Sequence, residues 1–190
     1  MPTNTNTVAV VFTDLTAAQV NDLLADFYRP LWSGPSGEES TGEAVARHLE
    51  ATVSLLDRDG WIRTYDQGKT WGAGTDLAED DSMTVKAMLK ALLRFVRDEV
   101  GDQDPRRTLS TALRHVGEAG TRGDTDTASI ASDVLDLVVR AHTGTKSARA
   151  TPWSERQRRT HGDITALMAA GARFARTYGP GTARAQEPAA

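Results

Sequence analysis

The chain contains no cysteine among its 190 residues, which excludes disulfide bonds, thiolate nucleophiles and cysteine metal ligands. It has no apolar run near the roughly 18 residues that a membrane-spanning helix needs. The segment Met1 to Thr7 carries no Lys or Arg and therefore lacks the basic start of a secretory signal. These absences predict a cytoplasmic protein without a membrane partner.

Signatures of catalytic sites are also missing. The sequence has no Gly-x-Ser-x-Gly elbow, phosphate-binding glycine loop or dinucleotide fingerprint. Its four histidines fall in different predicted helices or helix ends, and none has a ligand-type residue at the i+4 spacing of a helical metal pair. We therefore expect no metal and no cofactor. The chain is interpreted as non-enzymatic, with the reservation that catalytic groups converging only in space leave no motif.

Helical patterning is what the sequence does contain. With 39% hydrophobic residues the chain can bury one core, and these residues recur at helical spacing along most of its length. We predict an all-α, single-domain bundle of about six helices within residues 13–178. A flexible arm or short strand is expected at 1–12, and a disordered tail at 179–190. The helices are expected near residues 13–29, 40–59, 82–100, 104–117, 130–144 and 160–178.

Capping residues and glycines define the expected helix ends. Ser40 with Glu43, and Thr160 with Asp163, have the spacing of a capping box. Asp104-Pro105 is a cap and first-turn pair. Gly171, on the apolar face of the last helix, predicts a close approach to a neighbouring helix.

The end of the second helix leads into an aromatic loop. Gly60 suits the position just past a helix C-terminus, and Trp61 follows where it can fold back over the last turn. The pattern over residues 61–73 predicts a small β-hairpin excursion. We interpret Gly60, Trp61 and Trp153 as a structural clasp, in which the two indoles meet and seal one end of the core.

The other two tryptophans lie in loops with little apolar support. Trp32 and Trp71, together with Arg63 and Tyr65, are therefore the candidate partner-binding residues. The alternative, that these indoles also seal the core, stays open at this point.

Charge is divided unequally along the chain. Residues 1–139 hold 13 Lys and Arg against 23 Asp and Glu, whereas residues 140–190 hold 9 against 3. Arginine with an interleaved tryptophan is typical of a surface that binds nucleic acid. The competing interpretation is that these cations pair with the acidic first part of the same chain. The candidate nucleic-acid-binding residues are Lys146, Arg149, Arg156, Arg158 and Arg159.

Several short motifs resemble an uncharacterised helical domain of unknown function found in actinobacteria and their phages. That family pairs a helix ending in R-D-G-W with a later W-N-D, an R-T and an amphipathic final helix. The resemblance covers roughly residues 43–176 and rests on Leu56–Trp61, Asp81–Leu93, Trp153–Glu155 and Arg159-Thr160. Ser154 stands where the pattern often has Asn, and Met88 where it often has Cys. The resemblance implies a domain boundary and no activity.

Three hypotheses follow for function. The first is a non-enzymatic helical domain of bacterial or phage origin that binds an unknown protein partner or itself. The second is an accessory or regulatory protein that binds nucleic acid through the basic segment 146–161. The third is a small-ligand binder or enzyme that uses the loop from Trp61 to Trp71.

Overall fold

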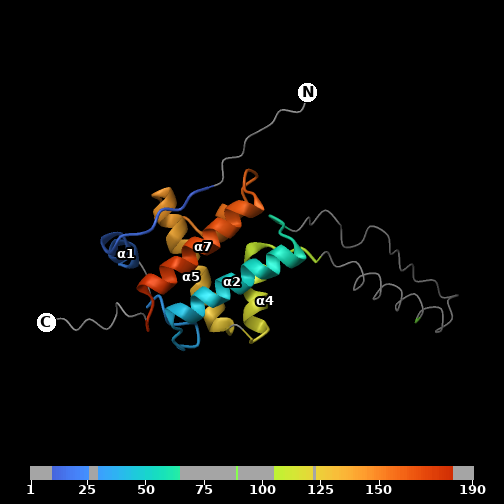
Figure 1. The fold of residues 1–190 in the computed structure, drawn as a ribbon, viewed down its shortest axis with the longest axis horizontal. Coiled ribbons are helices and arrows are strands. Elements are labelled where there is room, and N and C mark those ends of the chain that lie inside the picture. Colours follow the sequence, from blue (N-terminus) through green and yellow to red (C-terminus); the bar gives the residue numbers. More distant parts are fainter. Residues whose placement is uncertain (1–9, 26–29, 65–88, 90–104, 122, 182–190) are drawn as a thin grey trace, which may run out of the picture.

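The computed structural model describes residues 10–25, 30–64, 89, 105–121 and 123–181. β-Pairing within these residues is limited to two isolated bridges. The predicted all-α bundle is therefore confirmed (Figure 1). The helices of this part of the chain are α1 (Ala17–Leu24), α2 (Gly42–Asp59), α4 (Leu109–Glu118), α5 (Thr125–Thr143), α6 (Ala150–Ser154) and α7 (His161–Tyr178).

Helices α2 and α7 form the most extensive pair, and α5 packs against both (Figure 1). Gly171 of α7 faces this junction. A Cβ at Gly171 would lie 2.7 Å from Leu135 Cδ2 of α5 and 3.1 Å from Leu49 Cδ1 of α2. Both leucines are fully buried. The close approach predicted at Gly171 is confirmed.

Hydroxyl and carboxylate side chains cap the helices, in part at residues other than those predicted. The capping box of Thr160 with Asp163 opens α7 as expected. Thr41 rather than Ser40 caps α2, because the Ser40 hydroxyl lies 2.8 Å from that of Thr127 instead. Thr108 caps α4, so this helix begins after Pro105 rather than at it.

The short helix α6 lies in a stretch for which the sequence predicts no helix. Its first backbone N–H, that of Ala150, donates to Asp136 of α5 at 2.7 Å, and Asp136 also accepts from the Arg149 side chain at Nη1, at 2.7 Å. Asp136 is only 5% exposed. One buried carboxylate therefore fixes α6 on α5.

The described residues on either side of 65–104 meet at the end of α2. Gly60 ends α2 with a φ of 88°, a conformation that favours glycine. Arg107 N–H donates to the Gly60 carbonyl and Ile62 N–H to the Arg107 carbonyl, both at 3.0 Å. The predicted hairpin at 61–73 and the predicted helix at 82–100 lie mostly outside the described residues. Among the described helices none is long and apolar enough to cross a membrane.

Candidate protein-docking groove

An extended segment, Val10–Leu15, precedes α1 and runs alongside α5 and α7 (Figure 1). We call it the arm. The sequence predicts either a flexible arm or a short strand in this region, and its described residues are in extended, unpaired conformation. The surface beneath it, the docking groove, is formed by His142 of α5, Trp153 of α6, and Asp163, Arg173 and Tyr178 of α7.

Phe12 is the anchor of the arm. Its side chain is 7% exposed, and its ring centroid lies 4.7 Å from that of His142 and 5.6 Å from that of Trp153. Both ring pairs are tilted rather than stacked, an arrangement that aromatic quadrupoles favour. An aromatic side chain in a desolvated pocket is the usual energetic centre of a peptide contact.

Polar contacts hold the arm on either side of Phe12. The Val10 N–H donates to Asp163 Oδ1 at 3.0 Å. Asp14 Oδ1 pairs with Arg173 Nε at 3.1 Å, and the Tyr178 hydroxyl donates to the Leu15 carbonyl. The groove thus recognises two backbone groups, one aromatic ring and one carboxylate of an extended segment.

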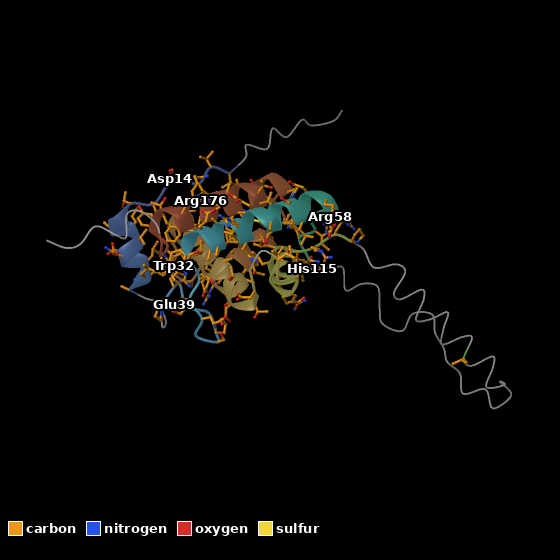
Figure 2. The ribbon with its side chains drawn as sticks, turned by 60° about the horizontal axis from the view of Figure 1, so that its bottom comes forward. Asp14, Trp32, Glu39, Arg58, His115 and Arg176 are labelled. Carbon is orange, nitrogen blue, oxygen red and sulfur yellow. The ribbon has the colours of Figure 1, made fainter. Side chains whose placement is uncertain are left out.

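The arm does not fill the groove. A cavity of about 460 Å³ remains beside Phe12, within the size range of sites that bind small molecules or side chains. Figure 2 shows Asp14 and Arg176, which both line this cavity, close together at one end of the bundle. Apolar walls come from α5 and α7, and include Val138, Ala170 and Phe174.

Trp153 and Arg159 form the floor of the groove near α6. Trp153 is 1% exposed, and the guanidinium carbon of Arg159 lies 3.8 Å from its ring centroid. Trp153 Nε1 and Arg159 Nε are buried and make no hydrogen bond within the described part of the chain. Burial, and secondarily the charge of Arg156, lower the pKa of Arg159 against the opposing effect of Asp163. The indole thus carries a cation on its face.

Asp163 and His142 are both deprotonated near neutral pH, the first as a carboxylate anion and the second as a neutral imidazole. Burial raises the pKa of Asp163, but hydrogen bonds from the Val10 and Thr160 N–H groups outweigh it, and the net pKa is lowered. Burial, followed by the charge of Arg159, lowers the pKa of His142. The groove therefore presents an anion to the arm backbone and a neutral imidazole to the Phe12 ring.

The predicted partner-binding residues do not form one surface among the described residues. Trp32 is half-buried and stacks on Phe174, with ring centroids 6.2 Å apart, so it seals the core beside α7. Arg63 is exposed and lies shortly after the end of α2. Tyr65 and Trp71 lie outside the described residues.

The predicted nucleic-acid-binding residues divide into two groups. Arg149 pairs with Asp136, and Arg159 is half-buried on Trp153, so both have structural contacts. Lys146, Arg156 and Arg158 are exposed. The basic segment thus contributes both to packing and to the surface.

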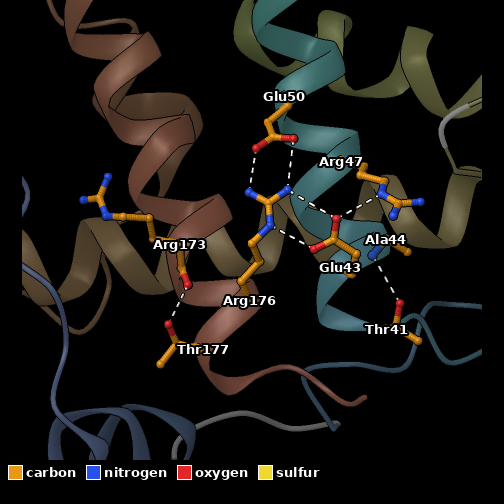
Figure 3. Close-up of polar contacts among 8 residues, drawn as sticks. All are labelled: Thr41, Glu43, Ala44, Arg47, Glu50, Arg173, Arg176 and Thr177. Atoms are coloured by element: carbon orange, nitrogen blue, oxygen red, sulfur yellow. Dashed lines mark hydrogen bonds and ion pairs between the residues drawn. The ribbon is translucent and has the colours of Figure 1, made fainter. Parts of the chain in front are cut away.

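Cations of the C-terminal part pair with acids of the first part. Arg176 Nη1 lies 2.6 Å from Glu50 Oε1, and Arg176 Nε lies 2.9 Å from Glu43 Oε2, as Figure 3 shows. These hydrogen bonds, with Glu50 foremost, raise the pKa of Arg176 and lower that of both glutamates. Arg173 with Asp14 is a further pair of this kind. Some acids of the first part of the chain and some cations of the last part therefore pair with each other within the fold.

The residues of the predicted clasp lie in different settings. Gly60 ends α2, and Trp61 is half-buried and forms a parallel bridge with Arg107. Trp153 is buried, and its ring contacts Phe12 and Arg159. That the two indoles meet stays a prediction.

Sequence reasoning missed the groove because its parts are far apart in the chain. Phe12, His142 and Asp163 are each ordinary in their own segments, and the Val10–Asp163 contact spans 153 positions. The sequence does contain one indication that the arm packs on the bundle, which is the apolar run Val8–Phe12 directly before a helix. Within the described residues there is no group of His, Asp and Glu that could hold a metal ion.

Comparison with known families places the groove relative to a recognised domain. Residues 40–174 match a family of unknown function, DUF6197. The chain belongs to this family. No curated protein and no solved structure matched the chain. The match includes His142, Trp153, Asp163 and Arg173, whereas the arm lies before it.

Proposed function

We propose that this DUF6197 protein is a non-enzymatic helical interaction domain, of bacterial or phage origin, that binds an extended protein segment in the docking groove. The observation that carries the proposal is the arm itself. It is an extended segment from outside the family match, and it occupies a groove built mostly from residues within that match, with Tyr178 just beyond its end. The resemblance to actinobacterial and phage domains supports the origin, and the absence of cysteine supports a cytoplasmic location.

The contacts define what the groove recognises. An aromatic side chain enters between His142 and Trp153, and an acidic side chain two positions later pairs with Arg173. Backbone groups on either side bond to Asp163 and Tyr178 and require only an extended chain. The groove therefore prefers a segment with the pattern aromatic-x-acidic, and the other side chains of that segment do not affect recognition.

Peptide binding to the full-length chain tests the proposal. A labelled peptide of residues 8–18 is titrated into the Phe12→Ala chain, whose own arm has lost its anchor. We expect binding to this variant and about tenfold weaker binding to the unaltered chain, whose arm competes at an effective concentration on the order of millimolar. The same peptide with Phe12→Ala is the matched control and should bind neither chain.

A charge exchange provides a second measurement that does not disturb the core. The side chains of Arg173 and Asp14 are 52% and 81% exposed. The Arg173→Glu chain should discriminate against the native peptide and favour a peptide with Asp14→Arg. If no chain variant binds any of these peptides, the groove is not a docking site and the proposal fails.

A second candidate function is contact with nucleic acid through Arg156 and Arg158. The observation that favours it is their exposure beside Arg159, which rests on the Trp153 ring. A mobility-shift titration across salt concentrations tests it, because each lost phosphate contact reduces the salt slope by about 1. Arg156→Glu with Arg158→Glu should abolish the shift. The hypothesis of a ligand site between Trp61 and Trp71 falls mostly outside the described residues.

A further inference from the structure

We infer that the arm is exchanged between two copies of this chain, so that Val10–Leu15 of one copy occupies the docking groove of the other. The inference rests on the proposed function, because it uses the same groove and names a second copy as the partner. Two features of the arm support it: one permits release of the arm, and the other favours a second copy.

The first feature is an incomplete fit. The cavity of about 460 Å³ lies directly against Phe12, Thr13, Asp14 and Leu15 of the arm. Side chains that line an unfilled space lose the dispersion contacts that a filled groove would supply. The loose fit therefore lowers the cost of releasing the arm and so permits exchange, but it favours neither copy, because the same cavity is present in the exchanged form.

The second feature is an exposed apolar side chain on the arm. Val11 is 75% exposed, and only Leu89 joins it among the large hydrophobic side chains exposed in the described residues. Neighbouring side chains of an extended segment point to opposite sides, so Val11 faces outward when Phe12 is buried. Two copies that face each other across their grooves would bring the two Val11 side chains to one interface and remove them from water.

The contacts of the arm are the same whichever copy supplies it. Each polar contact joins the arm to a residue more than 150 positions away, at Asp163, Arg173 or Tyr178. Exchange of identical segments keeps all native contacts and adds the interface between copies. The arm in its own copy competes at an effective concentration on the order of millimolar, so the exchanged form should increase with protein concentration.

Introduced cysteines report exchange without background, because the chain has no cysteine of its own. Asp14 Oδ1 and Arg173 Nε lie 3.1 Å apart, on side chains that are largely exposed. An Asp14→Cys chain is mixed with an Arg173→Cys chain at about 1 mM, near the effective concentration of the arm, and a short bismaleimide is added. We expect a covalent heterodimer of the two variants.

Two controls make the experiment specific. Glu118→Cys places a thiol on α4, away from the groove, and should give no heterodimer with Asp14→Cys. Val11→Ser keeps the arm's contacts with its groove but removes the proposed contact between arms. We expect this change, placed in both chains, to lower the heterodimer yield about tenfold, the factor that corresponds to 1.4 kcal/mol.

The outcomes separate this inference from the proposed function. No heterodimer with Arg173→Cys, or an equal yield with Glu118→Cys, overturns arm exchange. An unchanged yield with Val11→Ser also overturns it, because the arms then share no interface. If the peptide of residues 8–18 still binds the Phe12→Ala chain, the groove remains a docking site and its partner is a different protein. If peptide binding fails as well, both the proposed docking function and arm exchange are overturned.

Discussion

At the scale of the residue, Gly171 shows how one missing side chain allows three helices to meet. A side chain at this position would press against Leu135 and Leu49, which are fully buried and have little room to move. We expect Gly171→Val to lower the free energy of unfolding by about 1–3 kcal/mol through overpacking. Urea denaturation measures the change.

Gly162→Val is the matched control on the same helix. Its Cβ would meet only Thr160 Oγ1, at 3.7 Å, and its effect should stay within about 0.5 kcal/mol. An equal loss in both variants would contradict the close packing at Gly171.

His142 makes the packing of the arm depend on pH. Its pKa is lowered in the folded state by burial and by Arg159, so the unfolded chain binds this proton more readily. The stabilisation from neutral His142 is therefore complete above the unfolded pKa of about 6.5 and is lost as pH falls toward the lowered folded pKa. Because His142 is partly exposed, the loss should stay below about 1 kcal/mol.

The measurement compares urea unfolding of the unaltered chain and His142→Gln at about pH 7.5 and about pH 5.5. The difference between the two chains should shift in favour of the glutamine variant at the lower pH. Asp163 does not blur the result, since its pKa is lowered and it stays ionised across this window. A pH-independent difference would mean that His142 does not titrate in this range.

At the scale of the element, α6 depends on a single carboxylate of another helix. Asp136 accepts hydrogen bonds from Arg149 and from the buried Ala150 N–H. Asp136→Asn removes the charge and leaves one acceptor oxygen for two donors, so its NH2 group must face either the Ala150 N–H or Arg149, and it should cost about 1–3 kcal/mol of unfolding free energy. Arg149→Met removes an exposed partner and should cost less than about 1 kcal/mol. Both are measured by urea denaturation. A larger effect of Arg149→Met would assign the stability to the ion pair rather than to the capping of α6.

The helices that could be predicted from sequence are those whose signals are local. The capping box of Thr160 with Asp163 and the stop at Gly144 mark α7 and α5 because their partners lie within one turn. α6 has five residues, too few for an apolar period, and its cap lies 14 positions earlier in Asp136. The docking groove is even harder to predict from sequence, because its residues come from three helices and an arm that meet only in space.

At the scale of the whole molecule, the uneven charge of the chain is partly balanced by ion pairs within the fold. Arg173 and Arg176 bond to Asp14, Glu43 and Glu50, so acids of the first part are matched by cations of the last helix. These groups are largely exposed, and each pair contributes little to stability. Two of the basic side chains at the surface, Arg156 and Arg158, lie on the turn between α6 and α7.

The described residues that precede and follow 65–104 also lie next to each other. The bonds of Arg107 with Gly60 and Ile62 hold the two ends of this stretch side by side, and the surrounding helices bury a continuous core among their own residues. We expect that a short glycine-serine linker in place of residues 65–104 leaves α2, α4, α5 and α7 folded, because ends that already meet can be joined by a short loop at low entropic cost. Helical circular dichroism and a single cooperative urea transition measure the outcome. The variant with the same linker and Arg107→Pro, which removes the donor to Gly60, is the control and should be less stable. Loss of cooperative unfolding in the linker variant without Arg107→Pro would instead show that the core requires residues 65–104.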